Sequence, residues 1–122
     1  GERVIAYSEI PDGKFYDDAY QRRTKLFLLG VFGAQPERMP EAARTLNAEP
    51  AELGDFSVKV RAFPLVDIYP VLWKGDEEFP ADASVLLSER ITGFLNAEDA
   101  AMVAGLTVSY LARAAAKQKA GG

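Results

Sequence analysis

Three short β-type segments between residues 56 and 87 constrain the fold more than any other part of the sequence. Residues Phe56 to Phe63 alternate apolar and polar side chains, which is the pattern of a strand with one buried face. Pro64 ends this strand, and the apolar run Ile68 to Trp73 predicts its antiparallel partner. After a Pro- and Gly-containing acidic loop, Ala83 to Leu87 predicts a third strand. Pro70 lies inside the second segment, and because proline cannot donate a ladder hydrogen bond it predicts an edge strand or a bulge.

Two long helical segments flank this region. The first is predicted from about Tyr16 to Phe32, and its second half is apolar nearly all round, which is typical of a helix buried on several sides. The second is predicted from about Ala97 to Lys117, with Asn96 as its N-cap. Its expected buried side chains are Met102, Val103, Leu106, Tyr110 and Leu111. The shorter predicted elements are a strand at Arg3–Ile10, a helix at Pro40–Leu46, a loop at Asn47–Gly54 and a helical turn at Ser88–Leu95.

This order of elements lacks a regular alternation of strands and helices. It predicts an α+β fold, in which a small, mainly antiparallel sheet packs against two long helices. The 122 residues are the usual size of one compact domain, and 48% of them are hydrophobic, enough for one core. We therefore expect residues 1–122 to form a single α+β domain.

The composition excludes several kinds of chemistry. The chain contains neither cysteine nor histidine, so thiolate or imidazole zinc sites, cysteine-ligated iron–sulfur clusters and Cys–His or Ser–His catalysis lack their groups. No catalytic residues can be assigned: Ser84, Ser88 and Ser109 have no recognisable base, although lysine-based arrangements stay open. The net charge of −4 disfavours nucleic-acid binding. No apolar run approaches the ~20 residues that span a bilayer, so no membrane contact and a cytoplasmic location are expected.

The acidic loop is a candidate metal site. Asp76, Glu77 and Glu78 could offer oxygen ligands to Mg²⁺ or Ca²⁺. Three adjacent carboxylates cannot all point at one ion, so the alternative is a solvated turn shaped by Gly75 and Pro80, with one carboxylate bonding backbone amides. A further alternative is an ion pair between one of these carboxylates and Arg61 or Arg23.

A second candidate site is a ligand-binding face. Tyr16, Tyr20 and Arg23 share one side of the first long helix, where phenol and guanidinium groups could bind an anion. Arg61 and Trp73 are added from the strands, since a tryptophan at a strand end can stack on a ligand. The alternatives are an amphipathic helix with arginine at its margin, and a tryptophan that belongs to the core or an interface.

The central stretch FPLVDIYPVLWKGDEEFPADASVLL, residues 63–87, resembles a prokaryotic family of domains of unknown function, family 3786. The counterparts of the family pattern LWxGDEEFPxxAxxL are Leu72-Trp73, Gly75 to Pro80, Ala83 and Leu86. Residues 8–33 also resemble the family, at Pro11, Gly13, Tyr16, Tyr20, Arg23 and Phe32-Gly33. Family domains are longer, so the resemblance implies, as an expectation, that this chain corresponds to their C-terminal portion. Ser88 stands where an acidic residue is common in the family.

The resemblance implies a setting but no activity. Some relatives are joined to iron–sulfur modules of the kind seen with corrinoid proteins in anaerobes, so we expect a non-catalytic binding or accessory domain linked to such a cofactor-dependent pathway. A bound cofactor of this chain itself stays unknown. One alternative is a divalent-metal-dependent enzyme that uses the Asp76-Glu77-Glu78 loop. Another is a structural interaction domain, which pairs with a protein partner or forms a homodimer through an exposed sheet edge.

Overall fold

A computed structural model describes residues 3–121 of the chain. Its helices and strands, in chain order, are β1 (Val4–Ile5), η1 (Tyr7–Glu9), α1 (Gly13–Arg23), α2 (Lys25–Phe32), α3 (Arg38–Ala42), η2 (Ala43–Thr45), β2 (Ala48–Pro50), β3 (Phe56–Phe63), β4 (Val66–Trp73), β5 (Asp82–Ser88), η3 (Glu89–Gly93) and α4 (Ala97–Gly121). The antiparallel sheet and its separate helices confirm the predicted α+β class. The predicted loop at Asn47–Gly54 is partly wrong, because β2 lies there.

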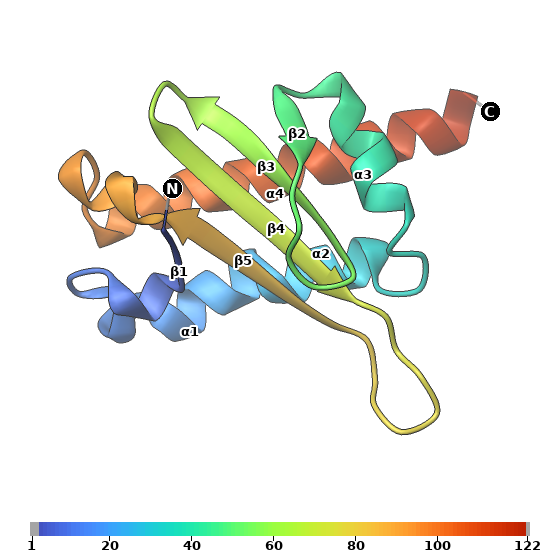
Figure 1. Cartoon of the computed structure of the whole chain (residues 1–122), viewed down its shortest axis with the longest axis horizontal. Helices are drawn as coiled ribbons and strands as arrows, with labels where there is room; N and C mark the ends of the chain where they lie inside the picture. Colours follow the sequence, from blue (N-terminus) through green and yellow to red (C-terminus); the bar gives the residue numbers. More distant parts are fainter. Residues whose placement is uncertain (1–2, 122) are drawn as a thin grey trace.

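The five strands form one antiparallel sheet in the order β1-β5-β4-β3-β2 (Figure 1). β3, β4 and β5 pair as neighbours, as the sequence predicts. β4 is the central strand, and all its residues from Val66 to Leu72 are buried. The edge position expected from Pro70 is therefore wrong. Between the pairs Ser57–Val71 and Val60–Ile68, Pro70 has no paired residue on β3. The N–H that proline lacks therefore falls within this gap in the pairing.

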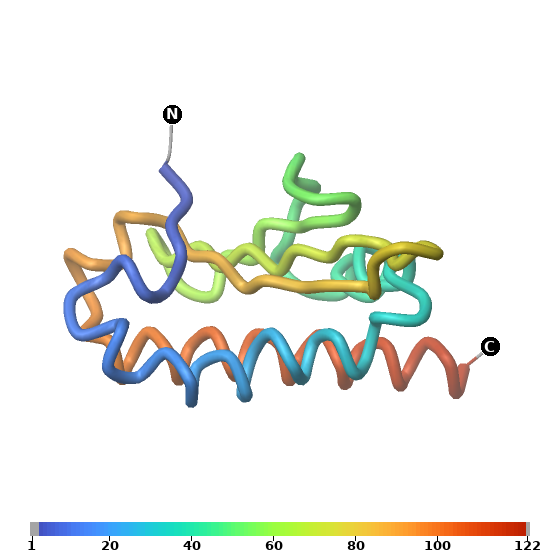
Figure 2. The backbone as a smooth tube through the Cα atoms, turned by 90° about the horizontal axis from the view of Figure 1, so that it is seen from below, coloured from blue at the N-terminus to red at the C-terminus, as the bar shows by residue number. Residues whose placement is uncertain are grey.

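The molecule has two layers (Figure 2). The sheet forms one layer, and α1, α2 and α4 lie side by side in the other. The core between the layers includes Val60, Ile68 and Leu87 from the sheet with Leu28 and Leu111 from the helices. Burying one such side chain stabilises the fold by about 1.5–3 kcal/mol. The layer of helices thus closes one face of the sheet and leaves its own outer side free to form a surface.

The predicted helix Tyr16–Phe32 is divided into α1 and α2 at Thr24, where ψ is −77°. The buried Thr24 hydroxyl donates to the Tyr20 carbonyl at 2.7 Å, a back-bond that bends helices. The Leu28 N–H still donates to the Thr24 carbonyl, so the two helices follow one another as a bent rod (Figure 2). Among the helices that the structure describes, only α4 is therefore long and unbroken. Its predicted N-cap is confirmed, since the Asp99 N–H donates to Asn96 Oδ1 at 2.8 Å.

The predicted buried face of α4 is only partly right. Val103 and Leu111 are buried, but Met102, Leu106 and Tyr110 are exposed to 54%, 49% and 50%. The buried face instead consists largely of alanine: Ala97, Ala100, Ala101, Ala104, Ala114 and Ala115. Small side chains let the helix backbone approach its neighbours closely, while Met102, Leu106 and Tyr110 are turned outward.

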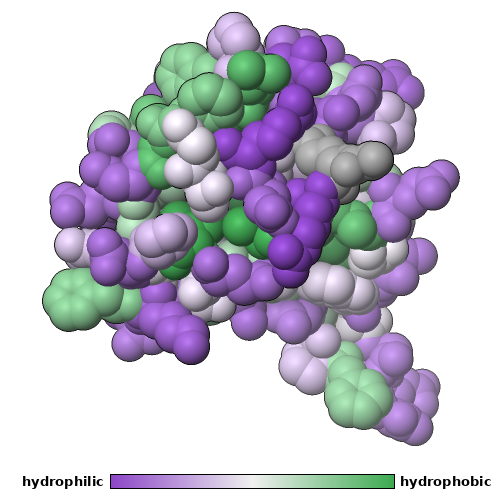
Figure 3. Space-filling view, turned by 60° about the vertical axis from the view of Figure 1, so that its left-hand side comes forward, coloured by the Kyte–Doolittle hydropathy of each residue, from purple (hydrophilic) through white to green (hydrophobic). Residues whose placement is uncertain are grey.

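The β4–β5 hairpin carries the acidic loop. In Figures 1 and 3 it extends beyond the rest of the molecule as a largely hydrophilic projection. All residues from Trp73 to Pro80 are exposed, and Phe79 at the tip is 67% exposed. The loop thus has few neighbours outside its own residues.

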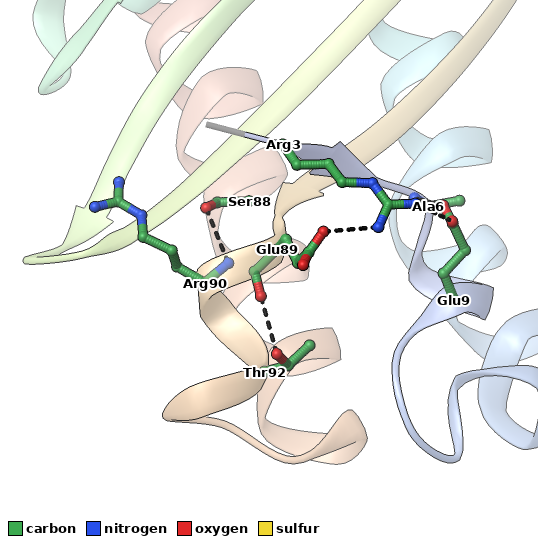
Figure 4. A network of polar contacts seen from close by, with 7 residues as sticks. All are labelled: Arg3, Ala6, Glu9, Ser88, Glu89, Arg90 and Thr92. Atoms are coloured by element: carbon green, nitrogen blue, oxygen red, sulfur yellow. Dashed lines mark hydrogen bonds and ion pairs between the residues drawn. The ribbon is translucent and has the colours of Figure 1, made fainter. Parts of the chain in front are cut away.

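The predicted strand Arg3–Ile10 is shorter than expected. Only Val4 and Ile5 pair with β5, and η1 follows directly. Glu9 explains the early end of the strand, because its carboxylate accepts the Ala6 N–H at 2.7 Å and closes a turn. Figure 4 shows the adjoining contacts: Arg3 donates to Glu89 at 2.9 Å, and the Ser88 hydroxyl caps η3 by accepting the Arg90 N–H.

Two backbone groups of β5 that point away from β4 are bonded within the chain. The Ala83 N–H donates to Asp82 Oδ1 at 2.8 Å, and the Val85 carbonyl accepts the Tyr20 hydroxyl at 2.7 Å. Further along the strand, Leu87 pairs with Ile5 of β1. The exposed sheet edge expected as a pairing site is therefore partly closed at β5. None of the helices within residues 3–121 combines the length and apolar character needed to cross a membrane.

Candidate functional site

A cleft of about 380 Å³ separates α1 from the first turns of α4. We call it the α1–α4 cleft. The structure brings three predicted ligand-binding residues together here, since Tyr16, Tyr20 and Arg23 all line it. Glu98 and Met102 of α4 form part of the opposite wall. Residues one turn apart on α1 share one side of the helix, which explains why the sequence could group them.

The floor of the cleft is a pair of stacked rings. Tyr7 and Tyr20 lie parallel, with ring centroids 3.9 Å apart and an interplanar angle of 7°. Both hydroxyls donate inward to backbone carbonyls, that of Tyr7 to Ala97 at 2.6 Å and that of Tyr20 to Val85 at 2.7 Å. Burial raises the pKa of both phenols above the usual value. These two tyrosines therefore stay neutral and position α1, α4 and β5 relative to one another.

The rim of the cleft carries its charges. The Tyr16 hydroxyl donates to Glu98 Oε1 at 3.1 Å, and this hydrogen bond raises the pKa of the phenol. Arg23 is exposed on the same side. The rim thus holds a carboxylate already bonded to a phenol, together with an exposed guanidinium.

A second hollow, of about 360 Å³, continues the cleft along the helices and shares Arg23, Ala101 and Met102 with it. We call the two hollows together the helix groove. Its floor on α4 consists of small residues, Ala101, Gly105 and Ser109, and its apolar walls include Phe27, Met102 and Leu106. Beyond Leu106 and Tyr110 a third hollow of about 310 Å³ reaches the end of β3 at Phe63.

The exposed side chains that line the groove are the apolar Phe27, Met102 and Leu106 and the charged Arg22, Arg23 and Glu98. Met102, Leu106 and Tyr110 recur every fourth residue on α4, and Phe27 on α2 is 42% exposed. Single exposed apolar residues are common, but a contiguous apolar surface indicates an interaction site. The sequence reasoning assigned these α4 residues to the core, because periodicity identifies an apolar stripe without showing which structure covers it.

Trp73 does not line this groove, and Arg61 lines only the third hollow beside it. Arg61 Nε lies 3.3 Å from Asp67 Oδ1, and Arg90 Nη2 lies 3.4 Å from the other carboxylate oxygen. The Asp67 side chain is fully buried, so the two arginines compensate a charge in the central strand. The sequence analysis did not single out Asp67, although a carboxylate within the apolar run Val66 to Leu72 was a usable signal. Trp73 lies at the end of β4, beside Gly54.

The acidic loop is held by its own backbone. Asp76 Oδ1 accepts the N–H groups of Phe79 at 2.7 Å and Glu78 at 2.8 Å, and these bonds lower the pKa of the carboxyl. The Asp76 N–H closes the turn on the Phe79 carbonyl. Arg61 pairs with Asp67 and not with this loop. Within residues 3–121 no group of three or more acidic side chains is arranged to hold a metal ion, and the metal site at Asp76, Glu77 and Glu78 stays a prediction.

Comparison with known proteins places the chain in a family. The sequence model of a family described as "Domain of unknown function (DUF3786)" matches residues 1–110. It confirms the resemblance stated from the sequence. Neither the curated proteins nor the solved structures contain a match.

Proposed function

This chain belongs to the DUF3786 family, and we propose that it serves as a non-catalytic binding module that engages a protein partner through the helix groove. The observation that carries the proposal is the exposure of Phe27, Met102 and Leu106 around one hollow. Tyr110, one turn further along α4, is exposed beside the third hollow. Burying these side chains against a partner stabilises the complex through the hydrophobic effect, at about 25 cal/mol per Å² of apolar surface removed from water.

The chemistry of the groove favours a polypeptide over a small molecule. Small-molecule sites place several polar groups so that they converge on the ligand. Here the hydroxyls of Tyr7 and Tyr20 point into the protein, and that of Tyr16 is bonded to Glu98. What faces outward is an elongated surface between two roughly parallel rods. It is apolar at Phe27, Met102 and Leu106 and charged along its margin, which suits the apolar face of an amphipathic helix.

Gly105 supports a binding role for the floor. A glycine inside a helix costs about 0.5–1 kcal/mol relative to alanine. A Cβ at this position would meet only Arg23 Cβ, at 3.9 Å, an ordinary contact. Packing within the chain therefore does not require the missing side chain, whereas a partner that approaches the helix backbone closely would.

A photo-crosslinking residue placed at Met102 tests the proposal in an extract of the native cell. We expect one discrete adduct, which an excess of the unmodified chain suppresses and an excess of Leu106→Glu does not. The matched control is the same crosslinker at Phe79, which is also apolar and even more exposed than Met102 but lies on the hairpin tip. Equal adducts from the two positions, or equal competition by both chains, would overturn the proposal.

Two other expectations stay predictions. The link to a corrinoid- and iron–sulfur-dependent pathway rests on the family resemblance alone, and gene neighbourhood is its most direct test. The alternative of a divalent-metal-dependent enzyme at Asp76, Glu77 and Glu78 is addressed by the melting experiment given in the Discussion.

A further inference from the structure

The outer side of α4 has a self-complementary order of side-chain chemistry, centred on Leu106. Four residues before and after it stand the large apolar residues Met102 and Tyr110. Seven residues before and after it stand the opposite charges Asp99 and Arg113. Met102, Leu106, Tyr110 and Arg113 are exposed, and Asp99 is half-buried, so all five reach the surface of the helix layer.

Helix geometry places these residues on one stripe. At about 100° per residue, positions seven apart differ by only about 20°, so Asp99, Leu106 and Arg113 are nearly in line along the axis. Met102 and Tyr110 fall about 40° to either side of Leu106. A second copy of α4 laid antiparallel across Leu106 would therefore bring Met102 level with Tyr110 of the copy, and Asp99 level with Arg113 of the copy.

The two charges cannot satisfy each other within one chain. Fourteen residues of helix separate them by about 21 Å. Within residues 3–121 neither Asp99 nor Arg113 forms an ion pair, and the Arg113 guanidinium lies 5.6 Å from the centre of the Tyr110 ring. The cation is thus positioned beside the apolar stripe, where a carboxylate of a second helix could reach it.

We propose that the partner of the helix groove is a second copy of this chain, docked with its α4 antiparallel to the first and with a two-fold axis at Leu106. The inference rests on the binding function proposed for the groove and names its partner. In such an interface every contact occurs twice, so one charge pair per chain gives two per dimer, on either side of a central apolar contact. Self-complementarity favours this partner over an unrelated helix, because one sequence supplies both halves of each pair.

The route through the sheet is less suited to self-association. The expected sheet-edge dimer needs free backbone groups along β5. The Val85 carbonyl and the Ala83 N–H of that strand are already bonded to Tyr20 and Asp82. The helix layer, with its exposed stripe, therefore offers the more complete complementary surface.

The first test is the mass of the chain in solution, measured by sedimentation equilibrium over a range of concentrations. We expect a reversible monomer–dimer equilibrium for the natural chain. Leu106→Glu sets two carboxylates face to face on the axis and should abolish the dimer, whereas the control Phe79→Glu on the hairpin should leave it unchanged. A natural chain that stays monomeric, or a dimer that survives Leu106→Glu, overturns the proposal.

The second test exchanges the charges, so that misfolding cannot imitate the result. Asp99→Arg and Arg113→Asp each create two like-charge contacts, and each should raise the dimer dissociation constant at least about tenfold. Mixed in equal amounts, the two variants restore both opposite-charge contacts and should form a heterodimer of near-natural affinity. Failure of the mixture to recover association, with both variants melting normally, overturns the antiparallel arrangement.

The outcomes separate this inference from the function on which it rests. A monomeric chain that still gives a competed adduct from Met102 would keep the groove as a binding site for a different protein. A dimer that responds to the charge exchange, with an adduct consisting only of two copies of the chain, supports both statements.

Discussion

The acidic loop and the helix groove differ in how their sequences relate to their surfaces. The loop, residues 75–80, is the most distinctive motif in the chain, yet the hydrogen bonds around Asp76 are bonds to the loop's own backbone. The groove has no motif, and its residues form an ordinary apolar pattern, yet that pattern remains exposed. A distinctive motif can therefore reflect the local requirements of a turn. A binding surface, in contrast, can have the same apolar pattern as a buried helix face.

The largest expected effect tests whether the outer stripe of α4 is separate from the core. Leu111 is fully buried beneath the same helix, so Leu111→Ala should lower the free energy of unfolding by about 2–5 kcal/mol. Leu106→Ala, in dilute solution, should change it by about 0.5 kcal/mol or less. Chemical denaturation measures both. Equal losses would make Leu106 part of the core and remove the contrast with the loop.

A smaller effect is expected at the floor of the groove. Tyr20→Phe leaves the Val85 carbonyl without its hydroxyl donor, and an unsatisfied buried acceptor costs about 1–3 kcal/mol. Tyr16→Phe removes a hydroxyl from an exposed carboxylate and should cost less. A denaturation curve for Tyr20→Phe that matches the natural chain would contradict the structural role given to this phenol.

A modest effect is expected in the loop. Asp76→Ala should lower the melting temperature slightly, because two backbone N–H groups lose their acceptor, while Glu77→Ala should not. The lowered pKa of Asp76 fixes the pH dependence: its contribution is fully present above the ordinary value of about 3.9 and is lost as the pH falls through the folded-state value. Between pH 6 and pH 2 the melting temperature of the natural chain should therefore include a loss due to protonation of Asp76. This loss should be absent from Asp76→Ala.

The last prediction is that divalent metal ions have no effect on the melting temperature. Mg²⁺, Ca²⁺ or Mn²⁺ should not raise the melting temperature if the loop is a self-contained turn. A native-state ligand at a hundred times its Kd would add about 2.7 kcal/mol, which a thermal melt detects. A metal-dependent rise in the melting temperature that disappears in Glu77→Gln and Glu78→Gln would identify the loop as a metal site. The loop, and not only the groove, would then be a binding surface.

Local sequence rules predicted much of the fold. Alternation at Phe56 to Phe63, the N-cap at Asn96 and the turn around Gly75 and Pro80 each depend on near neighbours, and the structure contains the strand, the cap and the turn. The errors lie where contacts between residues that are distant in the sequence determine the structure. Pro70 was predicted to lie at an edge or a bulge because its neighbours across the sheet were unknown. β1 ends early because of the contact between Glu9 and the Ala6 backbone.

The candidate site was predicted only in part, for the same reason. Tyr16, Tyr20 and Arg23 were grouped because they share a side of one helix, and the structure places them in one cleft. Met102, Leu106 and Tyr110 were assigned to the core, since an apolar stripe has the same periodicity whether the fold or a partner covers it. The alanine-rich opposite side of α4 was the available sign that the helix packs through its small residues.

The bonded backbone of β5 has a consequence for the behaviour of the chain at high concentration. With Val85 and Ala83 occupied, and with Pro50 at the end of the opposite edge strand β2, the sheet offers little backbone for an added strand at either side. Strand-by-strand growth into fibrils is therefore obstructed while the native state holds. Any assembly that uses the helices around a two-fold axis instead is self-limiting, and stops at a pair.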